Sequence, residues 1–273
     1  MEMKNKSTLI LCLIAVLMLA MTATPGRAQF LDSASGLLQA PSAEMNPSGT
    51  FMITNNWMDK HTLAAFPWGY RTFQYGFDIT FWSRFEFAYV MTIIDGSKMP
   101  DDDPNDPLEP YWKIMFNQDR HFYAKIQLLK ENEFGWKWVP SIAVGVSDPT
   151  TGGISGDYWD RNVKYGGNGY FNRYYAVATK HFNTKIGEIG VHFGYQYNQR
   201  LDYHLNGPCG GLNWRPKWVQ NDWVRLNLIA EYDARTFNLG MVASIYKDHF
   251  DLMFEWQNLQ WISFGIRYKL VLY

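Results

Sequence analysis

The stretch WVRLNLIAEYDARTFNLGMVASIYKDHFDLMFEWQNLQWISFGIRYKLVLY (residues 223–273) contains four segments in which every second residue is apolar. Alternation with a period of two is typical of a β-strand that presents one apolar and one polar face. Short breaks at residues 233–236, 247–248 and 257–260 separate the four segments. Strands joined by such short connections pair as neighbours, so this stretch predicts an antiparallel meander.

The composition of the whole chain favours a membrane barrel over a soluble sandwich. Of its 273 residues, 17% are aromatic, including 12 Trp and 17 Tyr, which suit the interface between membrane and water. Beyond the N-terminal segment, no stretch approaches the ~18 consecutive apolar residues of a membrane helix. A transmembrane barrel combines these properties, because its apolar face contacts lipid and its polar face lines the lumen. The net charge of -1 gives no support to nucleic-acid binding.

Residues 1–28 have the features of a signal peptide. Two lysines precede an apolar core over residues 9–23, and a small-x-small cleavage site follows directly before Gln29. The alternative is a retained N-terminal anchor helix, which the shortness of the apolar core disfavours. Cleavage leaves Cys209 as the only cysteine, which excludes a disulfide framework and a cysteine metal site.

About twelve strands are expected in residues 50–273, after an irregular, turn-rich leader over residues 29–49. The earlier strands are expected over residues 50–57, 70–78, 83–92, 120–130, 139–147, 174–181, 186–197 and 208–215, and the final meander adds four. An even number suits bacterial outer-membrane barrels, whose external loops are longer than their periplasmic turns, and most connections follow that asymmetry. The predicted fold is a single antiparallel up-and-down transmembrane β-barrel.

Four short stretches of the chain carry a family resemblance. They are GLLQAPSA (residues 36–43), AVGVSD (143–148), YAVATK (175–180) and EYD (231–233), the last followed by the final meander. Together, in this order and spacing, they resemble the YjbH-like family of outer-membrane proteins, the relatives of GfcD. The resemblance implies an association with exopolysaccharide and capsule export, and it brings no catalytic residue.

The polar faces of the predicted strands direct charges of both signs into the lumen. Opposite charges on neighbouring strands stabilise one another, so we expect them to pair and partly fill the bore. The acidic residues of the penultimate strand should face the basic residues of the last strand. The expected lumen charge network consists of Arg84, Glu86, Lys125, Glu188, His192, Arg225, Glu231, Asp251, Glu255, Arg267 and Lys269.

A long segment over residues 148–173, rich in Gly and aromatic residues, is expected to form an external loop. Aromatic faces beside carboxylates suit stacking on sugar rings and hydrogen bonding to hydroxyl groups, whereas an interfacial aromatic belt is the alternative interpretation. The candidate glycan contacts in this loop are Asp157, Tyr158, Trp159, Tyr165 and Tyr170.

The sequence predicts no catalytic site, metal site or cofactor. Phosphate-binding glycine motifs, His-Glu-x-x-His and Gly-x-Ser-x-Gly are absent, and the six His have no metal-ligand spacing. His192 and Glu188 share one predicted strand face and form the alternative catalytic pair. Adjacent polar residues are nevertheless expected in the lumen of any barrel.

The first functional hypothesis is a non-enzymatic β-barrel in the outer membrane of a Gram-negative bacterium, accessory to exopolysaccharide or capsule export or assembly. Its expected partners are outer-membrane lipid, polysaccharide and export-system proteins, without nucleic acid. Two alternatives are an outer-membrane barrel enzyme acting on lipid, peptide or glycan, and a soluble periplasmic β-barrel binding a small apolar ligand. Fractionation separates the last alternative from the other two hypotheses.

Overall fold

The structure is a computed structural model that describes residues 29–62, 72–94, 117–149, 171–198 and 205–272. Within these ranges the chain forms twelve β-strands and two short 3-10 helices. The strands are β1 (Thr50–Met58), β2 (Thr72–Phe81), β3 (Phe85–Ile94), β4 (Asn117–Leu129), β5 (Ser141–Ser147), β6 (Arg173–Thr184), β7 (Gly187–Tyr197), β8 (Gly207–Pro216), β9 (Val224–Tyr232), β10 (Phe237–Ile245), β11 (Phe250–Gln257) and β12 (Trp261–Val271), and the 3-10 helices are η1 (Glu133–Gly135) and η2 (Lys217–Val219). None of the helices in the described ranges is long and apolar enough to cross a membrane.

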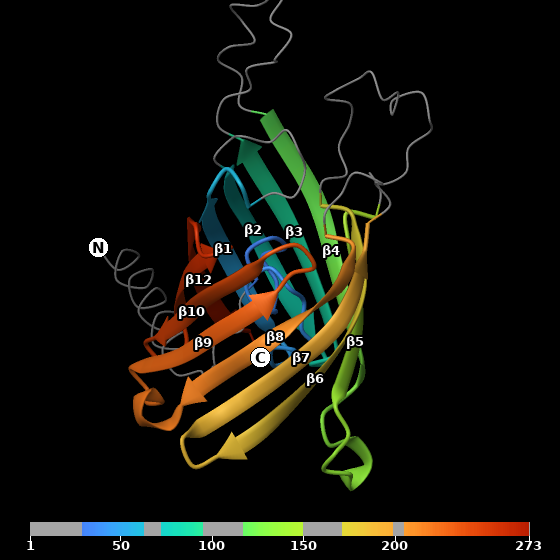
Figure 1. Cartoon of the computed structure of the whole chain (residues 1–273), viewed down its shortest axis with the longest axis vertical. Helices are drawn as coiled ribbons and strands as arrows, with labels where there is room; N and C mark the ends of the chain where they lie inside the picture. Colours follow the sequence, from blue (N-terminus) through green and yellow to red (C-terminus); the bar gives the residue numbers. More distant parts are fainter. Residues whose placement is uncertain (1–28, 63–71, 95–116, 150–170, 199–204, 273) are drawn as a thin grey trace, which may run out of the picture.

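The strands form one closed barrel (Figure 1). Each strand pairs antiparallel with the next one in sequence, and β12 pairs with β1 in a register that places Thr54 opposite Arg267. Closure removes the free strand edges whose backbone donors and acceptors would otherwise need other partners. The predicted antiparallel, up-and-down barrel of twelve strands is confirmed.

The two faces of the wall have opposite chemistry, as the alternation predicts. On β11, the side chains of Leu252 and Trp256 lie outside and are 47% and 43% exposed, whereas Asp251 and Glu255 lie inside and are fully buried. Strand β7 repeats the pattern, since Tyr195 is exposed outside and His192 is buried inside. The exterior is therefore apolar and aromatic, and the inner wall is polar.

The barrel has a turn end and a loop end. The turn end carries the connections at residues 82–84, 130–140, 185–186, 217–223 and 246–249, and the loop end carries the alternate connections. In the first tight turn, Trp82 and Ser83 have φ angles of 53° and 50°, and Arg84 N–H donates to the Phe81 carbonyl at 3.0 Å. Left-handed backbone at both central positions matches the twist of the flanking strands, which closes the hairpin.

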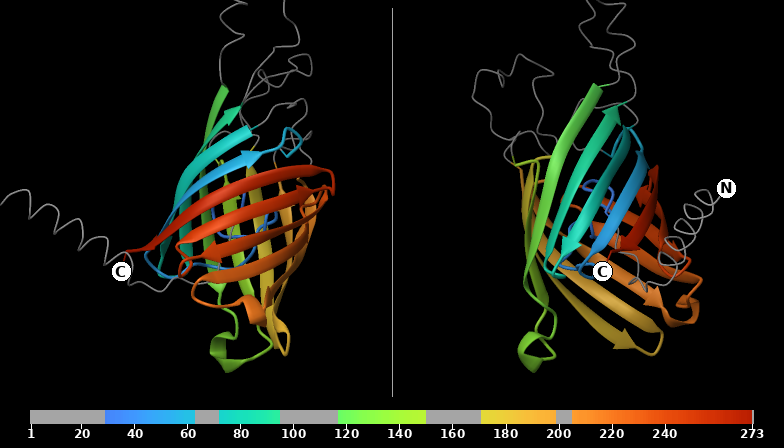
Figure 2. Two further views of the ribbon diagram at one scale, coloured as in Figure 1. Left: turned by 90° about the vertical axis from the view of Figure 1, so that its left-hand side faces the viewer. Right: turned by 180° about the vertical axis from the view of Figure 1, so that it is seen from behind.

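The segment expected as an irregular leader lies inside the barrel. We call residues 29–46 the plug; every one of these residues is buried, and an isolated β-bridge joins Gly36 to Pro41. Its blue trace crosses the space enclosed by the strands in both rotated views (Figure 2). The sequence predicted that side chains of the wall would partly fill the bore, whereas the plug occupies it.

The apolar core of the molecule is shared between the plug and the inner wall. Phe30, Leu37 and Leu38 of the plug form one buried cluster with wall residues that include Cys209 and Ile229. A second cluster unites Ala34 and Ala43 of the plug with small and aromatic residues of β3 to β6. A barrel of ~8 strands can be filled by side chains alone, whereas a wider one leaves room for a segment of chain.

Candidate functional site

Glu231 on β9 binds the tight turn of the plug. Its carboxylate accepts hydrogen bonds from the backbone N–H groups of Leu38 at 2.8 Å, Gln39 at 2.7 Å and Ala40 at 3.2 Å. Because a buried backbone N–H requires a partner, Glu231 determines the conformation of this turn.

Further wall residues bind the same part of the plug from other strands. The Gln39 side-chain amide donates to Glu255 at 2.7 Å, and the Gln39 carbonyl accepts a hydrogen bond from Arg173 at 2.9 Å. Arg173 also forms an ion pair with Asp32 of the plug, and the Ser147 hydroxyl donates to Asp32 at 2.5 Å. Strands β5, β6, β9 and β11 therefore all hold this region.

A buried ion pair between Glu86 on β3 and Lys125 on β4 encloses Ser35 of the plug. The two charged atoms are 2.7 Å apart. Glu86 accepts hydrogen bonds from the Ser35 N–H at 2.8 Å and its hydroxyl at 2.7 Å, while Lys125 donates to the Ser35 carbonyl at 2.7 Å. A buried ion pair offsets its desolvation cost only when further hydrogen bonds satisfy both ions, and the plug supplies them here.

Glu44 connects the plug to the wall near the turn end. Its Oε1 accepts a hydrogen bond from Arg215 on β8 at 2.8 Å and lies 3.0 Å from Nε2 of His181 on β6. Glu131, in the connection between β4 and β5, lies 2.6 Å from Nδ1 of the same histidine. Burial acts to raise the pKa of the Glu131 carboxyl, but its hydrogen bonds with His181 hold that pKa below its ordinary value.

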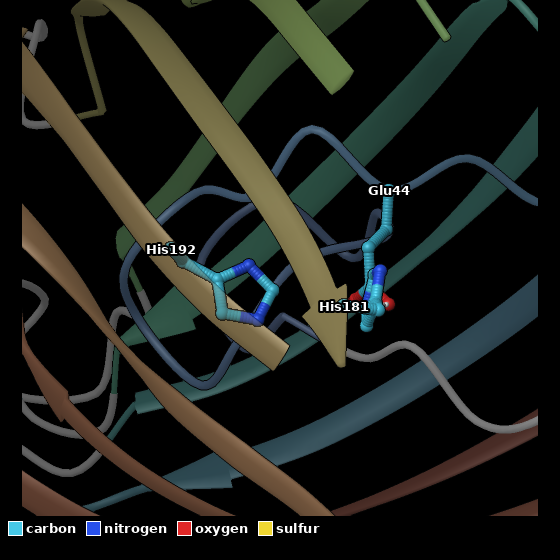
Figure 3. Close-up of side chains that lie close together, drawn as sticks. All are labelled: Glu44, His181 and His192. Atoms are coloured by element: carbon cyan, nitrogen blue, oxygen red, sulfur yellow. Dashed lines mark hydrogen bonds and ion pairs between the residues drawn. The ribbon is translucent and has the colours of Figure 1, made fainter. Parts of the chain in front are cut away.

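The neighbourhood of Glu44 has the donor types of a metal site. Figure 3 shows Glu44 reaching from the plug to His181, with His192 on the adjacent strand, and potential ligand atoms of the three lie within 4.8 Å of one another. The two ring nitrogens of His192 lie 2.9 Å from the Thr179 hydroxyl and 2.8 Å from the Asn213 side-chain oxygen. A cation would have to displace these partners beside the Arg215 guanidinium, so we assign the cluster to holding the plug.

Several members of the expected lumen charge network bind the plug. Glu86, Lys125, Glu231 and Glu255 do so through the contacts described above, and Arg267 donates to the Gln29 carbonyl at 3.3 Å. The predicted mutual pairing holds for Glu86 and Lys125, which form an ion pair across neighbouring strands. The sequence did not reveal the plug as a further partner of these residues.

Other members of that network form ion pairs within the barrel. Asp251 and Lys269, on the last two strands, are 2.9 Å apart and buried, in the arrangement that the alternation suggested. Two further pairs join Glu188 to Arg215 at 2.5 Å and Arg225 to Asp248 at 2.5 Å. These contacts brace neighbouring strands and turns around the plug.

Some expected site residues lie away from the lumen or outside the described ranges. Arg84 lies in the turn between β2 and β3, where its half-exposed side chain pairs with Glu133 at 2.6 Å, so it does not belong to the inner wall. The candidate glycan contacts Asp157, Tyr158, Trp159, Tyr165 and Tyr170 all fall outside the described residues, as does the expected signal peptide.

Sequence reasoning missed both the plug residues and two of their main partners. Arg173 lies one residue before the expected strand over residues 174–181, so extending the alternation by one residue would have found it. Arg215 lies at the end of the expected strand over residues 208–215, where its inward parity was the available signal. Asp32, Ser35 and Glu44 follow no periodic pattern, so alternation could not place them. Their positions depend on contacts with wall residues distant in sequence.

These features define a class of protein: a closed twelve-stranded β-barrel whose polar lumen is occupied by its own N-terminal segment. The family described as "Exopolysaccharide biosynthesis protein YbjH" matches residues 32–271, a region that includes most of the plug and nearly all of the barrel. The chain therefore belongs to the YjbH exopolysaccharide biosynthesis family, as the sequence resemblance indicated. No curated protein matches the chain.

Proposed function

We propose that this protein is a non-enzymatic β-barrel of the Gram-negative outer membrane, accessory to exopolysaccharide or capsule export or assembly. The observation that carries the location is the continuous apolar and aromatic exterior around a polar, occupied lumen. Lipid can solvate such an exterior, whereas water would contact many exposed Phe, Ile and Trp side chains. The family description supports the link to exopolysaccharide.

The contacts inside the lumen support a non-enzymatic role. Both members of the alternative catalytic pair are engaged, since His192 has a partner at each ring nitrogen and Glu188 forms an ion pair with Arg215. A lumen organised around a segment of its own chain suits a gated or scaffolding barrel that works with export-system proteins and polysaccharide.

A deletion strain tests this function. Loss of the gene should reduce surface polysaccharide, and expression of the intact protein should restore it. The His192→Gln protein should restore surface polysaccharide to the same level. Its folding is checked on an SDS gel, where a folded barrel migrates differently in unheated and boiled samples. Failure of a folded His192→Gln protein, with normal rescue by the intact protein, would favour the enzyme alternative.

Membrane fractionation tests the proposed location. The protein should be recovered with the outer membrane and should need detergent for extraction. An unheated sample should migrate ahead of the boiled one on an SDS gel, because a barrel that resists SDS stays compact. Recovery in the soluble periplasmic fraction without detergent would contradict the location.

Leu228→Arg tests which face of the wall contacts lipid. Leu228 lies on the outer face of β9, so an arginine there should lower the free energy of unfolding by about 2–4 kcal/mol if it lies near mid-membrane. Asn227→Leu, on the inner face, should cost less, although it removes the 2.8 Å hydrogen bond from Asn213. Equal losses in liposome refolding experiments would mean that the outer face does not contact lipid.

A further inference from the structure

A cavity of about 450 Å³ with several polar and charged lining residues lies at the turn end of the lumen. It is bounded by β6, β7, β8, the helix η2 and β9, and its lining includes Asn183, Glu188, Arg215, Lys217, Gln220 and Arg225. Asn183, Glu188 and Arg215 lie on the inner face of their strands. Asn183 is the cross-strand partner of Glu188, and Glu188 is the cross-strand partner of Arg215. Its volume falls in the ~300–1,000 Å³ range of small-molecule sites.

One cation of this cavity is available to an anion. Arg215, Lys217 and Arg225 line the cavity, but Arg215 pairs with Glu188 and Glu44, and Arg225 pairs with Asp248 and Asp222. Lys217 forms no side-chain hydrogen bond or ion pair within the described part of the chain. Lys217 is exposed on η2 and can reach a ligand without breaking a contact.

Arg215 is the preorganised element of the cavity. The residue is only 5% exposed, and its two terminal nitrogens are fixed by Glu188 at 2.5 Å and by Glu44 at 2.8 Å. Its buried Nε–H has no hydrogen-bond partner among the described residues. A buried donor without a partner is costly, so a ligand oxygen at this position would be favoured.

The neutral groups of the cavity suit a hydroxyl-rich ligand. The Gln220 side-chain amide donates to the Leu226 carbonyl at 2.7 Å, which orients the amide, and Asn183 adds a second amide from the opposite hairpin. Guanidinium and ammonium groups recognise a carboxylate through charge-assisted hydrogen bonds, while amides exchange hydrogen bonds with hydroxyls. A uronic acid unit carries both kinds of group.

We propose that this cavity binds a carboxylate-bearing sugar unit of an acidic polysaccharide at the mouth of the lumen. The carboxylate contacts Lys217 and the free Nε–H of Arg215, and the hydroxyls contact Gln220 and Asn183. The assignment of a polysaccharide as the source of this ligand rests on the proposed function. Since Arg215 also binds Glu44, the sugar site shares a residue with the contact that holds the plug.

Calorimetry on the full-length protein in detergent tests the site, with hexagalacturonate as the probe. Binding is expected for hexagalacturonate and should weaken as salt is raised, whereas neutral maltohexaose and inorganic phosphate should bind much more weakly. Lys217→Gln should weaken hexagalacturonate binding about tenfold, the effect of losing one charged hydrogen bond. Lys137→Gln, which removes an exposed lysine at the same end but outside the cavity, is the matched control.

Several outcomes of the calorimetry would overturn the proposal. If hexagalacturonate does not bind, or if maltohexaose binds equally well, the ligand is not an acidic sugar. If inorganic phosphate binds as well as hexagalacturonate, the cavity is a general anion site. Equal effects of Lys217→Gln and Lys137→Gln place the binding elsewhere. Normal polysaccharide export in the deletion strain, together with Lys217-dependent hexagalacturonate binding, would refute the proposed function and leave the sugar site standing.

Discussion

A chain that begins at residue 47, and so lacks the plug, is expected to form steady ion channels in a planar bilayer, whereas the intact protein conducts poorly. The intact lumen is occupied by residues 29–46, all of which are buried. Without them, the polar wall would face a water-filled bore, as in barrels that have no internal segment. Single-channel recordings on both proteins, refolded into the same lipid, provide the measurement.

This comparison needs one control, and two results would contradict the expectation. The shift in SDS-gel mobility on heating must show that the shortened chain still forms a barrel, because the plug contributes to both buried clusters. A large, steady conductance of the intact protein would mean that the plug does not close the bore. A folded but non-conducting shortened chain would mean that side chains of the wall close it by themselves.

Glu231→Ala is expected to lower the free energy of unfolding by about 3–5 kcal/mol, because three buried N–H groups of the plug lose their acceptor and each costs about 1–3 kcal/mol. Glu231→Gln should cost less, since it keeps one acceptor oxygen. Urea titration of the refolded barrel in liposomes gives the values. Asp222→Ala, which removes a carboxylate that is 79% exposed, is the matched control and should have little effect.

The labelling rate of Cys209 reports whether the plug is loosened in the Glu231→Ala variant. Cys209 is 3% exposed and lies in the cluster that contains Leu37 and Leu38. A water-soluble thiol reagent should therefore label it slowly in a protein that comprises residues 29–273 and so retains the plug. Glu231→Ala should label faster, because the loosened turn exposes the thiol. Labelling rates and unfolding free energies equal to those of Asp222→Ala would show that Glu231 does not hold the plug.

The candidate site illustrates which kinds of contact the sequence can predict. The inward positions of Asp251 and Lys269 follow from strand alternation, and their 2.9 Å ion pair joins neighbouring strands in the final meander. The partner of Glu231 could not be predicted in this way. Its three hydrogen bonds reach residues about 190 positions away in sequence, in a segment without periodicity.

The sequence by itself determined the number of strands, their order and the chemistry of their two faces, because a period of two and short connections are local properties that each segment carries alone. Only the tertiary structure decided what fills the barrel. The plug mixes apolar and polar residues, is rich in turns and has no regular secondary structure, so its place depends on complementary groups that come together when β12 closes against β1. Glu231 then accepts hydrogen bonds from backbone N–H groups of the plug, and this arrangement cannot be derived from any single stretch of the chain.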